Sequence, residues 1–172
     1  NGETNSAVLQ GFTLKNGSAA FGGGILCSSS APTVRGNVLT DNKANSNGAG
    51  IYCRNLDAIV SNNLFYDNVA SNRGGAICCY YCSSRITNNT MVGNSAQEGG
   101  GLYVFDGSPV VTNSIVYNNS APTGPEIHGG SPVVTYSNIK GGWSGTGNID
   151  QDPLFVDETT GDLHLTLDSP CR

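Results

Sequence analysis

The chain lacks several features that would assign it to a common functional class. Its 172 residues contain no apolar run of about 18 residues, so the sequence does not predict a membrane-spanning helix. Charged residues are only 12% of the chain, and the net charge of −5 leaves it without a basic surface. We therefore expect no nucleic-acid partner. Neutral polysaccharides, or acidic ones bridged by a cation, remain open as partners.

The start of the chain carries no recognisable targeting signal. The sequence begins at Asn1 rather than at Met, and the charged-then-apolar pattern of a signal peptide is missing. Both a leader that has been removed and a longer parent protein are compatible with this start. The compartment therefore cannot be read from the first residues.

What the sequence does contain is a repeat. An apolar residue follows a glycine-rich stretch at positions 25, 51, 77, 102 and 127, with spacings of 26, 26, 25 and 25. Three further columns keep this step: Asn42, Asn68, Asn94 and Asn119; Val8, Val34, Val60, Ile86 and Val111; Leu39, Phe65, Met91 and Val116. Four columns in register over about 120 residues establish an internal repeat.

Each repeat unit predicts short strands rather than helices. Apolar residues alternate within the unit, as around Ile51 and Cys53, and Gly, Asn, Asp and Pro separate the short runs. Such a unit cannot bury an apolar face alone, so successive copies must stack into a solenoid. A period of 25–26 residues suits one turn of a three-sided coil. We predict an all-β parallel solenoid of about six to seven coils.

Asparagine is abundant, with 20 copies, and it recurs at the predicted corners. Stacked coils repeat at about 4.8 Å, so identical Asn side chains can hydrogen-bond to one another from coil to coil. The column through Asn42 predicts one such ladder. A second column comprises Asn37, Asn63 and Asn89, continued by Ser114 and Asn138.

These motifs resemble those of right-handed parallel β-helix repeat proteins, whose repeats follow the pattern "GGGIYC…SP.I..N.I..N.A". The resemblance covers about residues 6–140 and implies a single-stranded, right-handed β-helix. We assign residues 1–140 to its coils and residues 141–172 to a closing coil and cap of the same domain. The segment "DPLFVD…GDLHL…SPC" is similar to the end of many bacterial secreted or surface-attached members. This fold hosts enzymes and non-catalytic proteins alike.

The six cysteines divide into a column and a set of exceptions. Cys27, Cys53 and Cys79 lie 26 residues apart, which predicts a buried column in which one disulfide could form. In an oxidising compartment, Cys82 could instead pair with Cys78 or Cys79. We expect Cys171 to cap the last coil. His128 and His164 lie too far along the chain to complete a zinc site with these thiols, so we predict no metal.

Candidate catalytic groups are few. Asp41 and Asp67 are 26 residues apart and should lie on neighbouring coils, where they could act as nucleophile and acid or coordinate Ca²⁺. The competing interpretation is that both simply form corners, since the next copies have Gly93 and Asn118 at this position. Arg73 is a candidate base for lyase chemistry, although no recognisable motif surrounds it.

Aromatic residues are the candidates for ligand binding. Tyr52 and Tyr103 share an outward-facing column with Leu26, Cys78 and His128, and Tyr66 and Tyr117 belong to a second such column. An exposed ring could stack on a sugar; alternatively, Tyr is there because it favours strands or packs under a loop. Trp143 is expected in a loop that covers the end of the solenoid, with a carbohydrate subsite as the alternative.

The sequence favours a non-catalytic module, structural or glycan-binding, of a secreted or cell-surface bacterial protein. The alternative is a polysaccharide lyase or glycoside hydrolase that uses Asp41 and Asp67 or the surroundings of Arg73. We predict no cofactor other than a conceivable Ca²⁺, and a polysaccharide or cell-surface glycan as partner. Self-association through a flat face or an open end is a third hypothesis.

Overall fold

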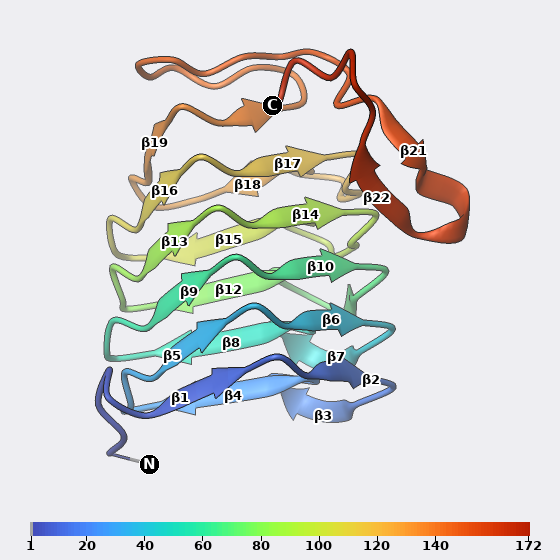
Figure 1. Cartoon of the computed structure of the whole chain (residues 1–172). Helices are drawn as coiled ribbons and strands as arrows, with labels where there is room; N and C mark the ends of the chain where they lie inside the picture. The colour runs from blue at the N-terminus through green and yellow to red at the C-terminus, as the bar shows by residue number, and fades with distance from the viewer. Residues whose placement is uncertain (1) are drawn as a thin grey trace.

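The computed structural model describes residues 2–172 and shows a parallel β-helix, a coil of short strands wound around one axis (Figure 1). Each turn contributes one strand to each of three sheets. The first sheet contains β1 (Val8–Gln10), β5 (Thr33–Arg35), β9 (Ile59–Ser61), β13 (Arg85–Thr87), β16 (Val110–Thr112) and β19 (Val133–Thr135). The second contains β2 (Thr13–Lys15), β6 (Val38–Thr40), β10 (Leu64–Tyr66), β14 (Thr90–Val92), β17 (Ile115–Tyr117) and β20 (Asn138–Ile139).

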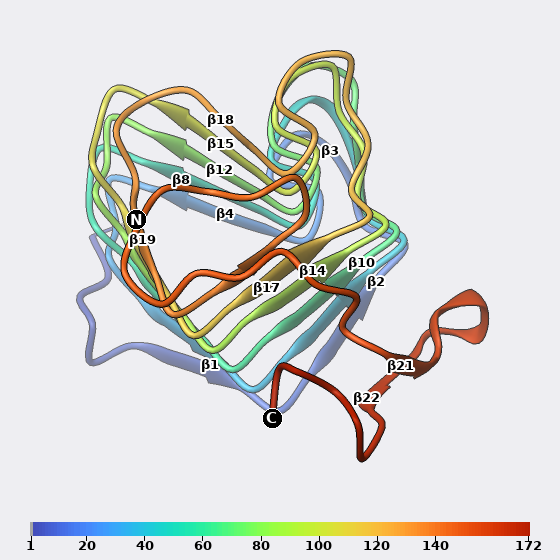
Figure 2. The ribbon, with the colours of Figure 1, turned by 90° about the horizontal axis from the view of Figure 1, so that it is seen from above.

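The third sheet and a side arm complete each turn. The third sheet contains β4 (Ile25–Ser28), β8 (Ile51–Arg54), β12 (Ile77–Tyr80), β15 (Leu102–Phe105) and β18 (Ile127–His128). Between the second and third sheets the chain makes an excursion that we call the arm, comprising residues 43–50, 69–76, 95–101 and their equivalents. The arm holds a small sheet of β3 (Ser18–Phe21), β7 (Lys43–Asn47) and β11 (Val69–Ala70). Viewed along the axis, the stacked arms project beside the third sheet (Figure 2).

The strand register confirms the repeat and corrects two of its details. Phe65 pairs with both Leu39 and Met91, as the period predicts. In the first coil, however, Leu9 and not Val8 pairs with Val34. The stack also contains about five full turns rather than six to seven. The difference arises because the residues after β20 leave the parallel pattern instead of adding further coils.

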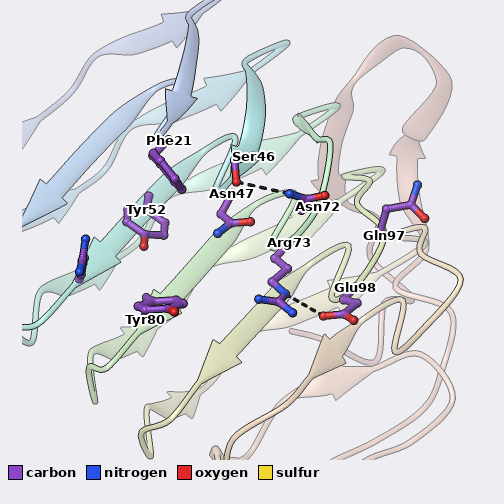
Figure 3. Close-up of a pocket in the computed structure, with 10 residues that line it drawn as sticks. Phe21, Ser46, Asn47, Tyr52, Asn72, Arg73, Tyr80, Gln97 and Glu98 are labelled. Atoms are coloured by element: carbon purple, nitrogen blue, oxygen red, sulfur yellow. Dashed lines mark hydrogen bonds and ion pairs between the residues drawn. The ribbon is translucent and has the colours of Figure 1, made fainter.

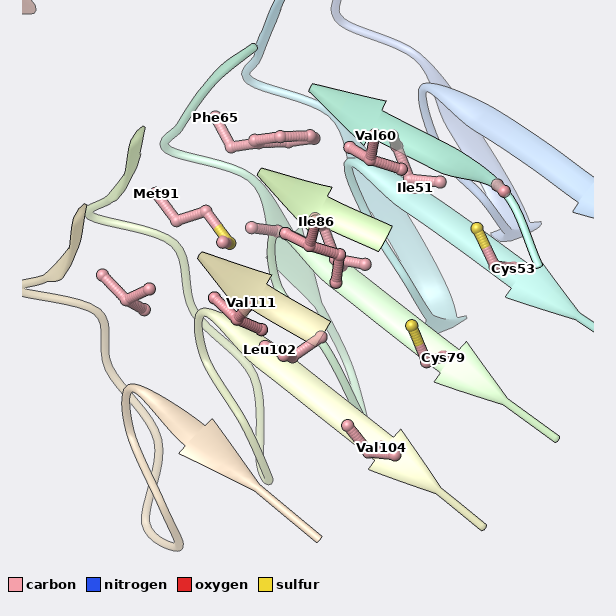
Figure 4. Close-up of a cluster of buried hydrophobic side chains, with 14 of the residues drawn as sticks. Ile51, Cys53, Val60, Phe65, Cys79, Ile86, Met91, Leu102, Val104 and Val111 are labelled. Carbon is pink, nitrogen blue, oxygen red and sulfur yellow. The ribbon is translucent and has the colours of Figure 1, made fainter. Parts of the chain in front are cut away.

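The core is a single column of apolar side chains inside the coils. Phe65, Ile77 and Leu102 are fully buried there, and the side chains of successive turns lie one above another (Figure 4). The predicted cysteine column is confirmed, since Cys27, Cys53 and Cys79 are all buried in this cluster. A separate small cluster of Ala44, Ala49 and Ala70 fills the arm, where only small side chains fit.

Two ladders of polar side chains run parallel to this core. In the first, the Nδ2 of Asn42 donates to the Oδ1 of Asn68 at 2.9 Å, and Asn68 donates to Asn94 at 2.8 Å. Asn94 donates in turn to Asn119 at 2.9 Å. Each Nδ2 also binds a backbone carbonyl of the preceding coil, as Asn68 does with Leu39 at 2.9 Å. The ladder therefore satisfies buried backbone groups that the corners leave unpaired.

The second ladder follows Asn37, Asn63 and Asn89 as predicted, but its continuation differs. The Oγ of Ser114 accepts from the Asn89 backbone N–H at 3.2 Å, and Ser137 rather than Asn138 comes next, at 3.1 Å. The reason is a shorter last repeat, because Val111 pairs with Val134 only 23 residues later. The register of Asn138 is consequently shifted by one residue, so that it pairs with Ile115 rather than with Ser114.

The first ladder ends on a buried carboxylate. The Nδ2 of Asn119 donates to the Oε2 of Glu126 at 2.6 Å, and the Asn119 backbone N–H donates to its Oε1 at 3.2 Å. Glu126 is only 6% exposed. Burial raises the pKa of this carboxyl to about 7, against the hydrogen bonds from Asn119, which lower it. Glu126 thus takes the place that a further Asn would occupy.

Steric constraints explain why glycines precede each strand of the third sheet. Gly48 and Gly74 adopt φ of 66°, a left-handed conformation that favours glycine. A Cβ on Gly48 would also lie 2.6 Å from the carbonyl oxygen of Ile51. The arm can therefore turn sharply back into the third sheet only with glycine at this position.

After β20 the chain covers the end of the stack and then leaves it. Ile149 bridges to Asn138, and Trp143 packs against the end of the core. An antiparallel hairpin follows, formed by β21 (Phe155–Asp157), the 3₁₀ turn η1 (Glu158–Thr160) and β22 (Asp162–Leu165). The hairpin projects beside the second sheet, where Gly161 lies near the Tyr66 ring (Figure 1). Cys171 returns to the end of the stack and accepts a hydrogen bond from Asn138.

Asn68→Ala is expected to destabilise the protein by about 2–4 kcal/mol, because it removes three hydrogen bonds donated by the Asn68 Nδ2 and the two that its Oδ1 accepts from the backbone N–H and Nδ2 of Asn42. Urea unfolding followed by circular dichroism measures the loss. Asn45→Ala is the matched control, since Asn45 is exposed on β7; it should change the free energy by less than about 0.5 kcal/mol. Equal losses for the two variants would contradict the ladder's role.

Glu126 should make stability depend on pH. The carboxyl titrates near 7 in the folded chain but near 4.5 when unfolded, so the folded state holds the proton more tightly between these values. Stability should therefore fall as pH rises through this window, by roughly 1–3 kcal/mol in total. Comparing Glu126→Gln with the parent protein in urea, at about pH 5 and about pH 8, isolates this effect. An unchanged pH dependence in the variant would refute it.

Candidate functional site

A groove lies where the arms project beside the outer face of the third sheet. Its volume is about 490 Å³. One wall is formed by β8 and β12 and the other by the arms of successive coils (Figure 3). Because both walls are built from stacked repeats, the groove runs along the axis of the solenoid. It is lined by Phe21, Ser46, Asn47, Tyr52, Arg54, Asn72, Arg73, Tyr80, Gln97 and Glu98.

The sheet wall of the groove is aromatic. Tyr52 and Tyr80 lie on adjacent strands with their ring centroids 6.2 Å apart, and Phe21 lies 5.2 Å from Tyr52. Tyr80 also stacks on Phe105, with centroids 4.5 Å apart and the planes only 10° from parallel. The parallel register stacks Tyr80 directly on Phe105, whereas Tyr52 is a diagonal neighbour of Tyr80 on the adjacent strand and Phe21 joins the rings from β3 of the arm.

The arm wall of the groove is polar. Ser46 accepts a hydrogen bond from the Nδ2 of Asn72 at 3.4 Å, and Asn47 lies between Tyr52 and the Asn72 side of the groove in Figure 3. Asn47 is 7% exposed, and its Oδ1 has no hydrogen-bond partner among residues 2–172. Because the terminal torsion of Asn is soft, the amide can turn its oxygen toward the groove. A bound donor there would satisfy a group that is otherwise unpaired.

Arg73 lies on the arm wall and is oriented by two neighbours. Its Nε donates to the Oε2 of Glu98 at 2.8 Å, and its guanidinium lies 4.9 Å from the centroid of the Tyr103 ring. The hydrogen bond to Glu98 raises the pKa of Arg73. The side chain is therefore held as a cation, and within the described part of the chain its Nη groups have no hydrogen-bond partner. Such a group suits binding of an oxygen-rich ligand better than removal of a proton.

The structure places the predicted tyrosines on the outer face of the third sheet, beneath the arm. The outward column of Tyr52, Cys78 and Tyr103 is confirmed by the register. However, the two tyrosines are each only 5% exposed, because the arm packs over them. Burial raises the pKa of Tyr52 to about 12. Tyr52 lines the groove and Tyr103 lies against Arg73, which agrees with the alternative that these tyrosines pack under a loop; their role in ligand binding stays a prediction.

A third tyrosine on this sheet, Tyr80, is more accessible than Tyr52 and Tyr103. Tyr80 is the last residue of β12, where it pairs with Arg54 and Phe105 in the same outward column. The alternation of side chains in a strand could have predicted this position. Tyr80 lies two residues after Cys78, the equivalent of Tyr52, and therefore points to the same outer face. Asn47 and Glu98 gave no such signal, since their relation to the groove depends on the fold of the arm.

Asp41 and Asp67 do lie on neighbouring coils, but they are not among the residues that line the groove. Each adopts φ of 55° at the corner before a ladder asparagine. Asp41 accepts a hydrogen bond from the Oγ1 of Thr40 at 3.0 Å. Partial burial raises the pKa of Asp67, and the negative charges of Asp41 and Glu158 add to the effect. The corner geometry explains both residues, while their catalytic role stays a prediction.

The remaining candidates fall outside the groove. Trp143 is half-buried against the end of the core, beside a small hollow that Glu126 and Lys140 also line. No group of three or more His, Cys, Asp or Glu arranged to hold a metal ion occurs among residues 2–172, so a Ca²⁺ site stays a prediction. Within the same residues, no helix has the length and apolar character needed to span a membrane.

Comparison with known proteins identifies the family but nothing finer. No curated protein and no solved structure matches the chain. The family model described as "Right handed beta helix region" matches residues 2–142, which are most of the chain and include all the coils described above. The ladders, the three parallel sheets and this match agree, and the chain belongs to the right-handed β-helix family.

Proposed function

We propose that this protein is a non-catalytic module that binds a polysaccharide chain lying along the groove. The observation that carries the proposal is the pairing of two different walls, a row of aromatic rings opposite a row of amide, hydroxyl and charged groups. Sugars present the same two kinds of surface. The faces of their rings pack on aromatic side chains, and their hydroxyls need hydrogen-bond partners.

The direction of the groove favours a polymer over a single sugar. Equivalent positions, occupied by different polar or aromatic side chains, recur at each coil about 4.8 Å apart along the axis. Tyr52 and Tyr80 come from consecutive turns, and so do Asn47, Arg73 and Glu98 on the arm wall. A chain of sugars running along the axis would therefore meet a similar set of contacts at each step.

The chemistry of the polar wall supports binding rather than bond cleavage. Arg73 is held as a cation by Glu98 and can donate its free Nη hydrogens to ligand oxygens. Asn47 can supply an acceptor or donors after a turn of its amide. No carboxylate pair faces the groove, since Glu98 is the one acid among the residues that line it.

Tyr80→Ala is expected to weaken polysaccharide binding by at least about tenfold, because it removes the accessible ring in the middle of the aromatic wall. Binding to a panel of neutral and acidic polysaccharides, with and without Ca²⁺, is measured by affinity electrophoresis or calorimetry. Tyr117→Ala is the matched control: Tyr117 is an outward-facing tyrosine on β17 of the second sheet, away from the groove. Equal losses for both variants, or no binding to any polymer, would reject the proposal.

The competing hypothesis is a lyase or hydrolase that uses the Asp41 and Asp67 corner. We expect no unsaturated or reducing ends to be released when the protein is incubated with the same panel. Product that disappears in Asp67→Asn but persists in Asp57→Asn, an exposed acid on another corner, would establish the enzyme instead. Binding by the parent protein together with absence of product supports the non-catalytic assignment.

We further propose that the module works outside the cell or on the surface of a bacterium. The support is its family and the resemblance of residues 152–171 to the closing segment of secreted and surface-attached members. A glycan-binding groove is useful where extended polysaccharides are accessible. Self-association remains a separate structural role, which would apply if the protein binds no polysaccharide and sediments as an oligomer.

A further inference from the structure

Four cysteines converge inside the solenoid, in the part of the core farthest from the ladders. Cys27, Cys53 and Cys79 occupy one register position on β4, β8 and β12. Cys82 follows β12 after the turn at Tyr81 and is only 4% exposed in the same cluster. All four carry thiols in this structure. Figure 4 shows Cys53 and Cys79 one above the other, with Val104 replacing cysteine in the next coil.

The position of Cys82 is unusual for this repeat. The equivalent residues one coil away are Leu56, which is 46% exposed, and Gly107. The equivalent residue of the first coil, Ser30, is also buried, so among these four coils only the third places a thiol beside the column. Its Sγ lies 3.7 Å from both the carbonyl oxygen of Cys53 and the Oγ of Ser84.

The positions of the four cysteines determine which pairs can form disulfide bonds. Cys27 is in register with Cys53 alone among these cysteines, and Cys82 follows Cys79 by three residues in the same buried cluster. Cys53 is in register with both Cys27 and Cys79, but a Cys53–Cys79 bond would leave the two outer thiols alone. Directly paired residues on parallel strands lie about 4.8 Å apart, within the Cα separation that a disulfide requires. Because Cys53 is the only direct neighbour of Cys27 in this column, an arrangement that uses all four thiols pairs Cys27 with Cys53 and leaves Cys79 to pair with Cys82.

We propose that this cluster is a site of oxidative modification, at which a small-molecule disulfide forms two bonds, Cys27–Cys53 and Cys79–Cys82. Cys78 takes no part, because its side chain points to the opposite face of β12 and packs with Tyr52 and Tyr103. This excludes the Cys78–Cys82 pairing that the sequence left open. Cys171 lies at the end of the stack and keeps its thiol.

The chemistry is thiol–disulfide exchange in two steps for each pair. The thiolate of Cys82 attacks one sulfur of the small disulfide and releases one small thiolate; Cys79 then attacks the mixed disulfide and releases the second. The two protein thiols are oxidised, the small disulfide is reduced, and the protons pass to the released thiolates. Cys27 and Cys53 react in the same way. Hydrogen bonds from Cys79 and Ser84 lower the pKa of Cys82, and one from Cys53 lowers that of Cys27, which favours these two as attacking groups.

The experiment maps the disulfides by tryptic digestion, because cleavage after Lys and Arg places the cysteines on separable peptides of the full chain. The protein is refolded with a mixture of oxidised and reduced glutathione, remaining thiols are alkylated, and tryptic peptides are identified by mass spectrometry. Cys27 falls in residues 16–35, Cys53 in residues 44–54, and Cys78, Cys79 and Cys82 in residues 74–85. We expect peptide 16–35 linked to 44–54, and peptide 74–85 with one internal disulfide and one alkylated thiol.

Two variants separate the thiols within the last peptide. Cys78→Ser should keep the internal disulfide and lose the alkylated thiol, whereas Cys82→Ser should lose the disulfide. Oxidation should raise the thermal midpoint of the parent protein by roughly 5–10 °C, mainly through the loop closed between Cys27 and Cys53. A link between peptides 44–54 and 74–85, or complete alkylation of folded protein after oxidation, would overturn the proposal.

Discussion

The structure depends on hydrogen bonds that run along the axis from one coil to the next. Backbone groups pair between coils throughout the three sheets, and at the corners the amides of Asn42, Asn68 and Asn94 continue the same pairing. Each amide both accepts from the coil before and donates to the coil after. An Asn in one coil is therefore useful only if the next coil carries an acceptor at the same place. This mutual dependence explains why one residue type recurs with so regular a spacing.

The same constraint shapes the groove. Because every coil is held in register with its neighbours, any side chain that points outward becomes part of a column. Tyr52 and Tyr80 belong to neighbouring columns of this kind, and their rings are brought together although they lie 28 residues apart in the sequence. The arms stack by the same rule and supply the opposite wall. A repeat that is fixed inside can vary outside, which is how a structural scaffold acquires a surface with its own chemistry.

Two buried reactive sites lie where the repeat departs from its regular pattern. Glu126 terminates the first ladder where the last repeat shortens, and a carboxylate there receives hydrogen bonds that an Asn would otherwise accept. Cys79 and Cys82 are buried in one cluster where the third coil departs from its neighbours. In both cases the surrounding coils enforce burial, so a change in one residue alters the electrostatics of a site that is otherwise apolar or amide-lined.

The sequence by itself determined the period, the strands, the ladder through Asn42 and the buried cysteine column, because each depends on spacing along one chain. It also placed Tyr52 and Tyr103 on the outer face, by the alternation of side chains in a strand. Only the tertiary structure decided that the arm covers these rings, that Asn47 and Arg73 face Tyr80, and that Ser137 rather than Asn138 continues the second ladder. These outcomes depend on how a loop packs across a neighbouring sheet and on where a coil is shortened, and neither is encoded in a periodic pattern.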